Sequence, residues 1–377
     1  MHRRLVLGLA ATLAMTVAMP AAWAQDTVKI ADVAELSGPG ATAGVNWNDG
    51  VKMAIEEINA AGGILGKQVE LSEYDSQSDA QTSRAMVQKA IDDGAYALLG
   101  TVYSGSTIVN MLVAQQAGVP QFVGSEAPKV TQMGNPFVFR TSIGAQKGVP
   151  SLTPFFKDNL KAAKVGVAWV NNEFGKGGHD VFIEEMQKAG IEVVADVPSE
   201  QGATDYAADV AKLKNSGADA VFVYMNQEEN ARFLVEARKQ SLPMPLVGDV
   251  TLNDQKVIEL AGEAANGAIA RAGLTVEAPE IAPMAARFQE KYGHLPIQDA
   301  IKGYISAWTT KYVTELVGEF DQAKFSETMH GLCLKAAEYP NILLDTCWDD
   351  TGEMSRAGFM IEVKDGKGVV IGTVPAN

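Results

Sequence analysis

The segment Gly100-Thr-Val-Tyr-Ser-Gly-Ser-Thr107 combines hydroxyl side chains with glycines at the point where an apolar run gives way to a helical pattern. A helix N-terminus exposes backbone amides that have no partner within the helix, and these amides favour a carboxylate. Tyr103 and Ser104 are therefore candidates for binding the acidic end of a small molecule. Simple N-capping of the helix by Ser104 or Ser106 is the alternative.

A second polar loop follows the next predicted strand. It consists of Gly124, Ser125, Glu126 and Ala127. In a parallel sheet the C-terminal ends of neighbouring strands lie together, so we expect this loop beside Ser104. Glu126 could receive an ammonium or amide group, and a solvated loop glutamate is the alternative.

The second half of the chain repeats this arrangement. Tyr224, Asn226 and Asp249 stand at or just after strand ends, and Asp249 is a second candidate partner for an ammonium group. Phe174, Tyr224 and Trp47 are candidate walls of a binding cleft. Core packing is the more common role of such aromatic residues.

Enzymatic alternatives find little support. Gly38-Pro-Gly-Ala-Thr-Ala43 fits the dinucleotide-binding pattern G-x-G-x-x-A, with Asp75 at the end of the next strand. Pro39 removes an amide from the turn, however, and the pattern predicts that the helix begins only near Asn46. No serine lies in a G-x-S-x-G motif, and the cleft loops hold no histidine except the nearby His179. We expect no cofactor, no catalytic residues and no enzymatic activity.

The chain has two cysteines, Cys333 and Cys347. In an oxidising compartment an even pair predicts a disulfide, and two free thiols are the alternative. The four histidines show no metal-ligand spacing, and one of them near two cysteines does not complete a zinc site. We therefore expect no metal.

The N-terminus has the layout of a secretory signal. Arg3 and Arg4 precede an apolar run over residues 5–19, and Ala22-Trp-Ala24 supplies small residues before a cleavage site at Gln25. This predicts a signal peptide over residues 1–24 and a periplasmic protein. No cysteine near the cleavage site could carry a lipid anchor, so we expect no direct membrane anchor.

The formal net charge is −15 at pH 7. An acidic surface repels nucleic-acid phosphates and anionic lipid headgroups, so neither is an expected partner. We expect a monomer that binds a small molecule.

Strand and helix patterns alternate along most of the chain, which predicts an α/β fold with parallel sheets covered on both faces. The first set is Val28–Val33, Asn46–Ala61, Gln68–Tyr74, Asp79–Asp93, Ala95–Leu99, Ser106–Gln116 and Val119–Val123. The second set is Lys164–Val170, Lys176–Ala189, Ile191–Val197, Tyr206–Asn215, Ala218–Met225, Gln227–Gln240, Leu246–Val247 and a helix from Asn253. Helices Ile281–Tyr292, Ile297–Val317 and Asp321–Leu332 and a hairpin, Ala357–Val363 with Val369–Val374, follow.

Two similar sets joined by extended segments predict two doubly wound parallel-sheet lobes that open and close about a three-segment hinge. We expect lobe 1 to comprise residues 25–141 and 275–355. Lobe 2 would comprise residues 142–274 and 356–377.

Several motifs in this order resemble the leucine/isoleucine/valine-binding protein family of type I periplasmic binding proteins. They are Leu36-Ser-Gly-Pro39, Gly50–Asn59, Ala61–Gly66, Asp75–Asp79, Gly100–Thr107, Phe174-Gly-Lys-Gly177 and Thr204-Asp-Tyr206. The resemblance implies the substrate-binding component of an ABC importer, which would pass an amino-acid-like ligand to membrane permease subunits.

The resemblance also assigns roles to single residues. It implies that Ser104 binds a carboxylate and that Phe174 covers the ligand. The chain departs from the pattern at Glu126, where the family has threonine, and at Ala43, where it has tyrosine. Asp249 matches the family's acidic residue only with a one-residue gap, and Asn226 or Tyr224 replaces an aromatic. These departures keep open an aromatic acid, an amide or a urea-like solute as the ligand, and a ligand-sensing role.

Overall fold

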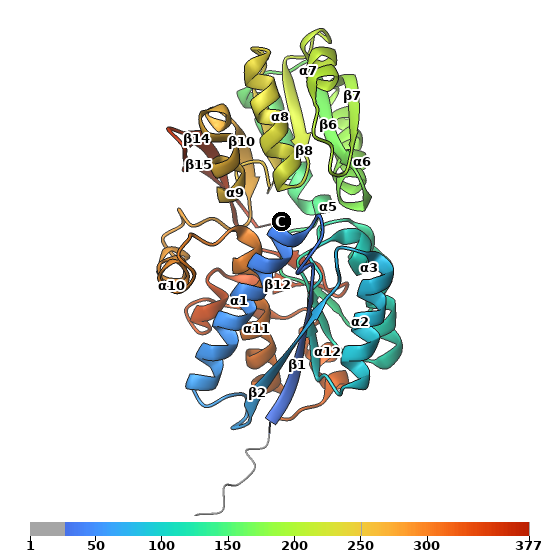
Figure 1. The fold of residues 1–377 in the computed structure, drawn as a ribbon, viewed down its shortest axis with the longest axis vertical. Helices are drawn as coiled ribbons and strands as arrows, with labels where there is room; N and C mark the ends of the chain where they lie inside the picture. The colour runs from blue at the N-terminus through green and yellow to red at the C-terminus, as the bar shows by residue number, and fades with distance from the viewer. Residues whose placement is uncertain (1–26, 250, 377) are drawn as a thin grey trace, which may run out of the picture.

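The computed structural model describes residues 27–249 and 251–376. The predicted signal peptide lies outside these residues. In the described part, the chain builds two large sheets, which Figure 1 shows one above the other with the connecting segments between them.

The first sheet contains five parallel strands in the order β2-β1-β3-β4-β5. The strands are β1 (Thr27–Ala34), β2 (Gln68–Asp75), β3 (Ala97–Leu99), β4 (Gln121–Val123) and β5 (Val138–Arg140). The connecting helices are α1 (Ala41–Ala60), α2 (Ala80–Asp92), α3 (Ser104–Ala117) and α4 (Lys129–Gln132). Strands β3, β4 and β5 are buried at every position, as expected for a parallel sheet covered on both faces.

The second sheet contains seven strands in the order β15-β14-β10-β9-β8-β6-β7. Its parallel strands are β6 (Lys164–Asn171), β7 (Glu192–Glu200), β8 (Ala220–Tyr224), β9 (Leu246–Asp249) and β10 (Ile269–Ala272). Its helices are α6 (Glu173–Ala189), α7 (Ala207–Lys214), α8 (Gln227–Lys239) and α9 (Gln255–Ala261), followed by the 3-10 turn Gly262–Ala265.

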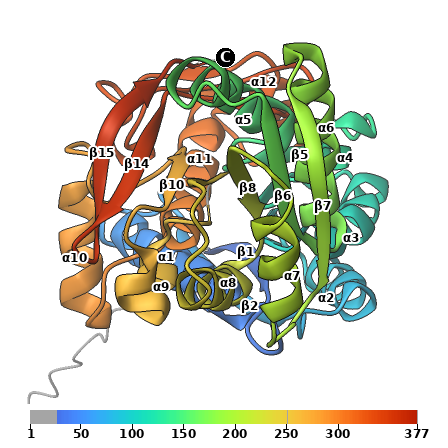
Figure 2. The same cartoon turned by 90° about the horizontal axis from the view of Figure 1, so that it is seen from above.

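The predicted hairpin forms one edge of this second sheet, and β7 forms the other (Figure 2). Strands β14 (Gly358–Lys364) and β15 (Lys367–Val374) pair antiparallel, and β14 pairs antiparallel with β10. The two turn residues, Asp365 and Gly366, both have positive φ, 49° and 72°. This is the backbone of a type I′ turn, for which Asp-Gly is a favoured sequence.

The chain passes from one sheet to the other after β5, after β10 and after β13. The first passage contains α5 (Ala145–Gly148) and the short helical turns Val149–Leu152 and Phe155–Asn159. Between the second and third passages the chain returns to the first sheet and forms α10 (Ala282–Tyr292), α11 (Gln298–Val317), α12 (Gln322–Met329), the turn Pro340–Ile342, β11 (Cys333–Leu334), β12 (Thr346–Trp348) and β13 (Met354–Ser355).

Helix α11 packs closely along α1 at two glycines. A Cβ added at Gly50 would lie 1.8 Å from the Ala300 carbonyl oxygen, and one added at Gly303 would lie 2.3 Å from the Trp47 carbonyl oxygen. Only glycine allows backbones to approach this closely. This contact brings α11, which begins more than 150 residues after β4, to the cleft side of the first sheet.

The predicted α/β fold with two doubly wound parallel sheets is confirmed, and the second sheet is extended by an antiparallel hairpin. The predicted lobe boundaries, after residues 141, 274 and 355, lie in the three passages. That the two halves move as separate domains stays a prediction. In residues 27–249 and 251–376 no helix is long and apolar enough to span a membrane.

Several predicted helix boundaries were wrong. Helix α1 begins at Ala41 rather than near Asn46, α3 at Ser104 rather than Ser106, and α6 at Glu173 rather than Lys176. Small and polar residues open α1 and α3, so these two first turns lack the large apolar side chains on which the sequence periodicity depends. In α6 the first turn contains Phe174, but polar residues and glycines surround it.

Candidate ligand-binding site

A cavity of about 140 Å³ lies between the two sheets. Its walls come from α1, α11 and the loops that follow the C-terminal ends of β2, β3 and β4 in the first sheet and β6, β7, β8 and β9 in the second. The lining residues are Ala43, Ser78, Ala80, Val102, Tyr103, Ser104, Gly105, Ser106, Gly124, Glu126, Asn172, Glu173, Phe174, Gln201, Asn226, Gln227, Thr251, Asp299 and Lys302. Open α/β folds bind ligands at this end of their sheets.

Ser104 is the first residue of α3 and is 2% exposed. Its Oγ accepts hydrogen bonds from the backbone amides of Glu126 at 3.4 Å and Ala127 at 3.2 Å. No side chain caps α3, so the N-capping alternative for Ser104 and Ser106 does not describe this helix. Ser104 Oγ is the acceptor in both hydrogen bonds, so the hydroxyl proton of Ser104 remains available for donation to a ligand.

A buried glutamate holds the loop before α3. The carboxylate of Glu35 accepts hydrogen bonds from the amides of Val102 at 3.2 Å and Tyr103 at 3.1 Å. Burial raises the pKa of Glu35 to about 7, while these two hydrogen bonds act in the opposite direction. The Tyr103 hydroxyl donates to the carbonyl of Pro39 at 3.2 Å, which fixes its ring at the cavity wall.

Glu126 is paired with a lysine rather than solvated. The ammonium of Lys302 lies 2.8 Å from Glu126 Oε1 and 3.1 Å from Asp299 Oδ1, and these side chains are 3–4% exposed. Burial acts to lower the pKa of Lys302, because it disfavours the charged ammonium. The negative charges of Asp299 and Glu126 have the larger effect, so the pKa of Lys302 is raised. Burial raises the pKa of Glu126 to about 7, although Lys302 favours its ionised form. Glu126 Oε2 is buried and has no hydrogen-bond partner among the described residues.

The loop that carries Glu126 is fixed from behind by Arg140. This buried guanidinium donates to the carbonyls of Ser125 and Ala127, the latter at 2.6 Å, and forms an ion pair of 2.7 Å with Glu353. Gly124 and Glu126 consequently line the cavity, whereas Ser125 and Ala127 lie behind it.

The second sheet contributes one aromatic wall and several amides. Phe174, in the first turn of α6, lines the cavity and stacks on Tyr224 with ring centroids 4.3 Å apart. Tyr224 is fully buried behind Phe174 and does not line the cavity. Asn226 lines it, and the buried Nδ2 of Asn226 has no hydrogen-bond partner among the described residues.

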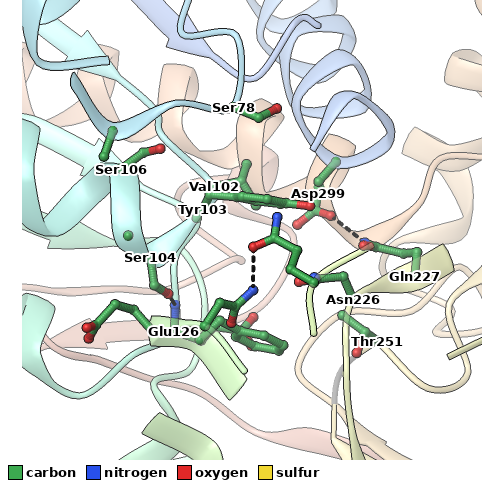
Figure 3. A pocket seen from close by; sticks show the side chains of 18 of the residues that line it. Ser78, Val102, Tyr103, Ser104, Ser106, Glu126, Asn226, Gln227, Thr251 and Asp299 are labelled. Atoms are coloured by element: carbon green, nitrogen blue, oxygen red, sulfur yellow. Dashed lines mark hydrogen bonds between the residues drawn. The ribbon is translucent and has the colours of Figure 1, made fainter. Parts of the chain in front are cut away.

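Gln227 joins the two sides of the cleft. Its Nε2 donates to Asp299 Oδ2 at 3.0 Å, as the dashed line in Figure 3 marks. Gln227 begins α8 of the second sheet, and Asp299 is in the first turn of α11. Figure 3 also shows Tyr103, Ser104 and Glu126 on the side of the cavity opposite Asn226 and Thr251.

Like Ser125, Ala127 and Tyr224, the predicted residues Asp249 and Trp47 do not line this cavity. Asp249 is 1% exposed, its Oδ1 is 3.9 Å from Arg271, and β10 places Arg271 directly beside it in the sheet register. Trp47 is fully buried and donates from Nε1 to Asp32 Oδ1 at 2.9 Å. Contact of either residue with a ligand stays a prediction.

The residues of the dinucleotide-like motif have structural partners. The Gly40 amide donates to Ser78 Oγ at 2.9 Å. Asp75 accepts from the amides of Leu36 and Ser37, both at 3.1 Å, and from Ser37 Oγ at 2.7 Å. Asp75 thus fixes the loop after β1. His179 packs on Trp169 and does not line the cavity.

The predicted disulfide is confirmed, because Cys333 and Cys347 are bonded across the β11–β12 pair. Within residues 27–249 and 251–376, no group of histidine, cysteine, aspartate and glutamate side chains could hold a metal ion.

The sequence analysis did not identify Lys302, Asp299, Gln227 or Glu35. One signal was present for the first two. Asp299 and Lys302 are spaced i and i+3 in the largely apolar helical segment Asp299–Ala307, and charged residues are seldom fully buried unless they are paired.

Comparisons with known proteins agree with this architecture. The leucine-, isoleucine-, valine-, threonine-, and alanine-binding protein of Pseudomonas aeruginosa is 26% identical over 341 residues, which cover 90% of each chain. A branched-chain amino acid transporter substrate binding protein from Streptococcus pneumoniae, solved with isoleucine, has a TM-score of 0.82 at 24% identity and covers 93% of this chain and 100% of its own. An ABC transporter solute binding protein from R. palustris, solved with benzoate, has a TM-score of 0.84 at 20% identity and covers 93% of this chain and 97% of its own.

At these identities the two solved structures establish the fold alone. A family model described as periplasmic binding protein matches residues 27–367, which include the first sheet, all strands of the second sheet except β15, and every residue that lines the cavity. This chain belongs to the periplasmic binding protein family.

Proposed function

We propose that this protein is the substrate-binding component of an ABC transporter, which captures an amino acid or a related small solute of the branched-chain type and delivers it to the membrane permease. The relatives named for leucine, isoleucine and valine support this ligand class. The predicted signal peptide over residues 1–24 supports a periplasmic location.

The cavity between the two sheets is the observation that carries the proposal. Its volume, about 140 Å³, is comparable to that of engineered protein cavities that accept benzene, so it suits one small solute. A ligand held there contacts both sheets, so the difference between its binding free energies in the closed and open forms drives closure.

The polar groups of the cavity suit a zwitterion. The carboxylate would bind to the Ser104 hydroxyl and to the amides of Gly105 and Ser106, which precede the first helical hydrogen bond, from Thr107 to Tyr103. The ammonium would bind to Glu126 Oε2. Phe174 would cover the apolar part of the ligand.

The proposed role is binding without chemical change. The described lining holds neither a histidine nor a cysteine, and Ser104, the buried hydroxyl at the α3 N-terminus, contacts backbone amides rather than a base. A nucleophile needs a base within hydrogen-bond distance.

A binding screen tests the ligand class. The mature protein, freed of bound solute by unfolding, dialysis and refolding, would be titrated calorimetrically with leucine, isoleucine, valine, threonine and alanine. Benzoate, acetamide and urea form the comparison set. We expect an aliphatic amino acid to bind most tightly. Binding of benzoate, acetamide or urea alone would refute the amino-acid assignment, and no binding in either set would refute the transport role.

Small-angle scattering tests closure. Lys129 and Glu173 form a 2.9 Å ion pair across the cleft, and Gln227 and Asp299 a 3.0 Å hydrogen bond. Without ligand these contacts should open, so the radius of gyration should decrease on ligand addition. An unchanged profile at saturation would contradict the hinge.

A further inference from the structure

The three passages between the sheets enclose a second cavity, of about 10 Å³. Thr141–Ile143 line it from the first passage, Gly273 and Leu274 from the second, and Arg356 from the third. Arg271 of β10 and Met354 of β13, which lead into the second and third passages, line it as well. A space of this size holds one water-sized particle. Any occupant is therefore a single water molecule or a monatomic ion.

Two arginines face this hinge cavity, each 2% exposed. Arg271 has one carboxylate neighbour, Asp249, at 3.9 Å, which is beyond hydrogen-bond distance. Arg356 donates to the Thr141 carbonyl at 3.0 Å and contacts Met354 Sδ, and it forms no ion pair with any described residue. A buried guanidinium without an anionic partner is costly in free energy.

Each arginine also has an unused donor. Arg271 Nε and Arg356 Nη1 are buried and have no hydrogen-bond partner within residues 27–249 and 251–376. Burial, and then the charge of Arg271, lower the pKa of Arg356 to about 9, so the Arg356 guanidinium remains charged at neutral pH. Lys302 lines the cavity as well, but its ammonium is occupied by Glu126 and Asp299 on the side of the ligand cavity.

We propose that the hinge cavity is a binding site for a halide ion, held between Arg271 and Arg356. The ion supplies the negative charge that Arg356 lacks and accepts hydrogen bonds from the two unused donors. Because all three passages line the cavity, the bound ion stabilises the arrangement in which they converge. The site is separate from the solute cavity, with Lys302 lining both.

Thermal unfolding of the mature protein tests the site. The melting temperature would be measured in sodium chloride, sodium bromide and sodium gluconate at equal ionic strength, since gluconate is too large to enter. We expect chloride and bromide to raise the melting temperature in a saturable manner and gluconate to leave it unchanged. Equal melting temperatures in the three salts would overturn the proposal.

The Arg356→Met variant separates the halide from general salt effects. Removing the unpaired charge should abolish the chloride response and leave the variant at least as stable as the wild type in gluconate. Arg232→Met is the matched control, because Arg232 is exposed and donates to the Ala203 carbonyl far from the hinge; it should keep the full response. If Arg356→Met retains the wild-type chloride response, the assignment is wrong.

Crystals of the wild-type protein provide a readout that does not depend on a variant. After a bromide soak, the anomalous difference map should contain a peak between Arg271 and Arg356. A water molecule at that position with no bromide signal would overturn the proposal, as would a peak found only at molar bromide without any halide effect on stability.

Discussion

Lys302 and Glu126 are 176 residues apart in the sequence, yet the Lys302 ammonium lies 2.8 Å from Glu126 Oε1 at the wall of the ligand cavity. The pair explains how this chain carries a glutamate where the branched-chain binders it resembles have threonine. A carboxylate ligand near an unpaired Glu126 would meet a like charge, which Lys302 compensates.

Removing this cation should destabilise the fold. Lys302→Met leaves Glu126 and Asp299 buried with no ammonium between them, which typically costs about 3–5 kcal/mol of unfolding free energy. Urea unfolding at pH 7.5 measures the loss. At pH 5.5 the loss should be smaller, because Glu126 can then take up a proton.

The double variant Lys302→Met/Glu126→Gln is the control for this first prediction. It removes both members of the pair, so part of the lost stability should return at pH 7.5. A double variant as unstable as Lys302→Met alone would show that the ion pair is not the origin of the loss.

Asp254 should give the free energy of unfolding an unusual pH dependence. Burial, followed by the nearby charge of Asp299, raises the pKa of Asp254 from 3.8 to about 8. A carboxyl with a raised pKa binds its proton more tightly in the folded state, so its contribution to stability is complete below pH 3.8. This contribution is lost as the pH rises to about 8, by up to about 1.4 kcal/mol per pH unit.

Asp254→Asn tests this dependence, because asparagine is neutral and also caps the α9 N-terminus well. Urea unfolding between pH 4 and 8 should show a flatter profile and a more stable variant at pH 8. Asp219→Asn is the matched control: hydrogen bonds from Lys164 and Ala163 lower the pKa of Asp219, so its contribution changes only below about pH 4 and this variant should keep the wild-type slope between pH 4 and 8. A wild-type slope in Asp254→Asn would refute the role of this carboxyl.

The general position of the ligand site could be predicted from the sequence. Ser104 and Glu126 follow β3 and β4, and the ends of neighbouring parallel strands must lie together, so two loops suffice to locate the first side of the cavity. Lys302 could not be placed in the same way. Its position depends on the close packing of α11 against α1 at Gly50, a contact that no local pattern encodes.

For Asp249 the position in the chain could be predicted from the sequence, but the direction of the side chain could not. Its position at the end of β9 could be predicted, but its orientation depends on which strand is its neighbour. In the sheet β10 pairs Arg271 with Asp249, so the carboxylate lies 3.9 Å from a cation, and Asp249 does not line the cavity of this structure. The start of α1 was missed for a different reason: Ala41 begins a turn of small residues, in which a Cβ at Gly44 would lie 2.2 Å from the Glu35 carbonyl oxygen.

Reduction of the disulfide should lower the melting temperature. Cys333 and Cys347 are separated by 14 positions, and closing a loop of this length stabilises the folded state by about 3 kcal/mol on the chain-entropy model. Differential scanning calorimetry with and without a reductant measures the effect. The Cys333→Ser/Cys347→Ser variant should melt at the temperature of the reduced protein and respond no further to reductant. Free thiols detected by mass spectrometry in periplasmic material would contradict the prediction.

Ser104 should contribute directly to ligand affinity. Its hydroxyl proton is available at the N-terminus of α3, and a hydrogen bond to a charged carboxylate contributes about 1.5–3 kcal/mol, so Ser104→Ala should weaken binding about tenfold or more. Isothermal titration calorimetry with the ligand found in the screen measures the change. Ser104→Thr keeps the hydroxyl and should retain most of the affinity. Glu126→Thr removes the proposed partner of the ligand ammonium, so this variant should bind the native ligand more weakly than the wild type. If Ser104→Ala and Glu126→Thr both leave every binding isotherm unchanged, the ligand does not occupy this cavity.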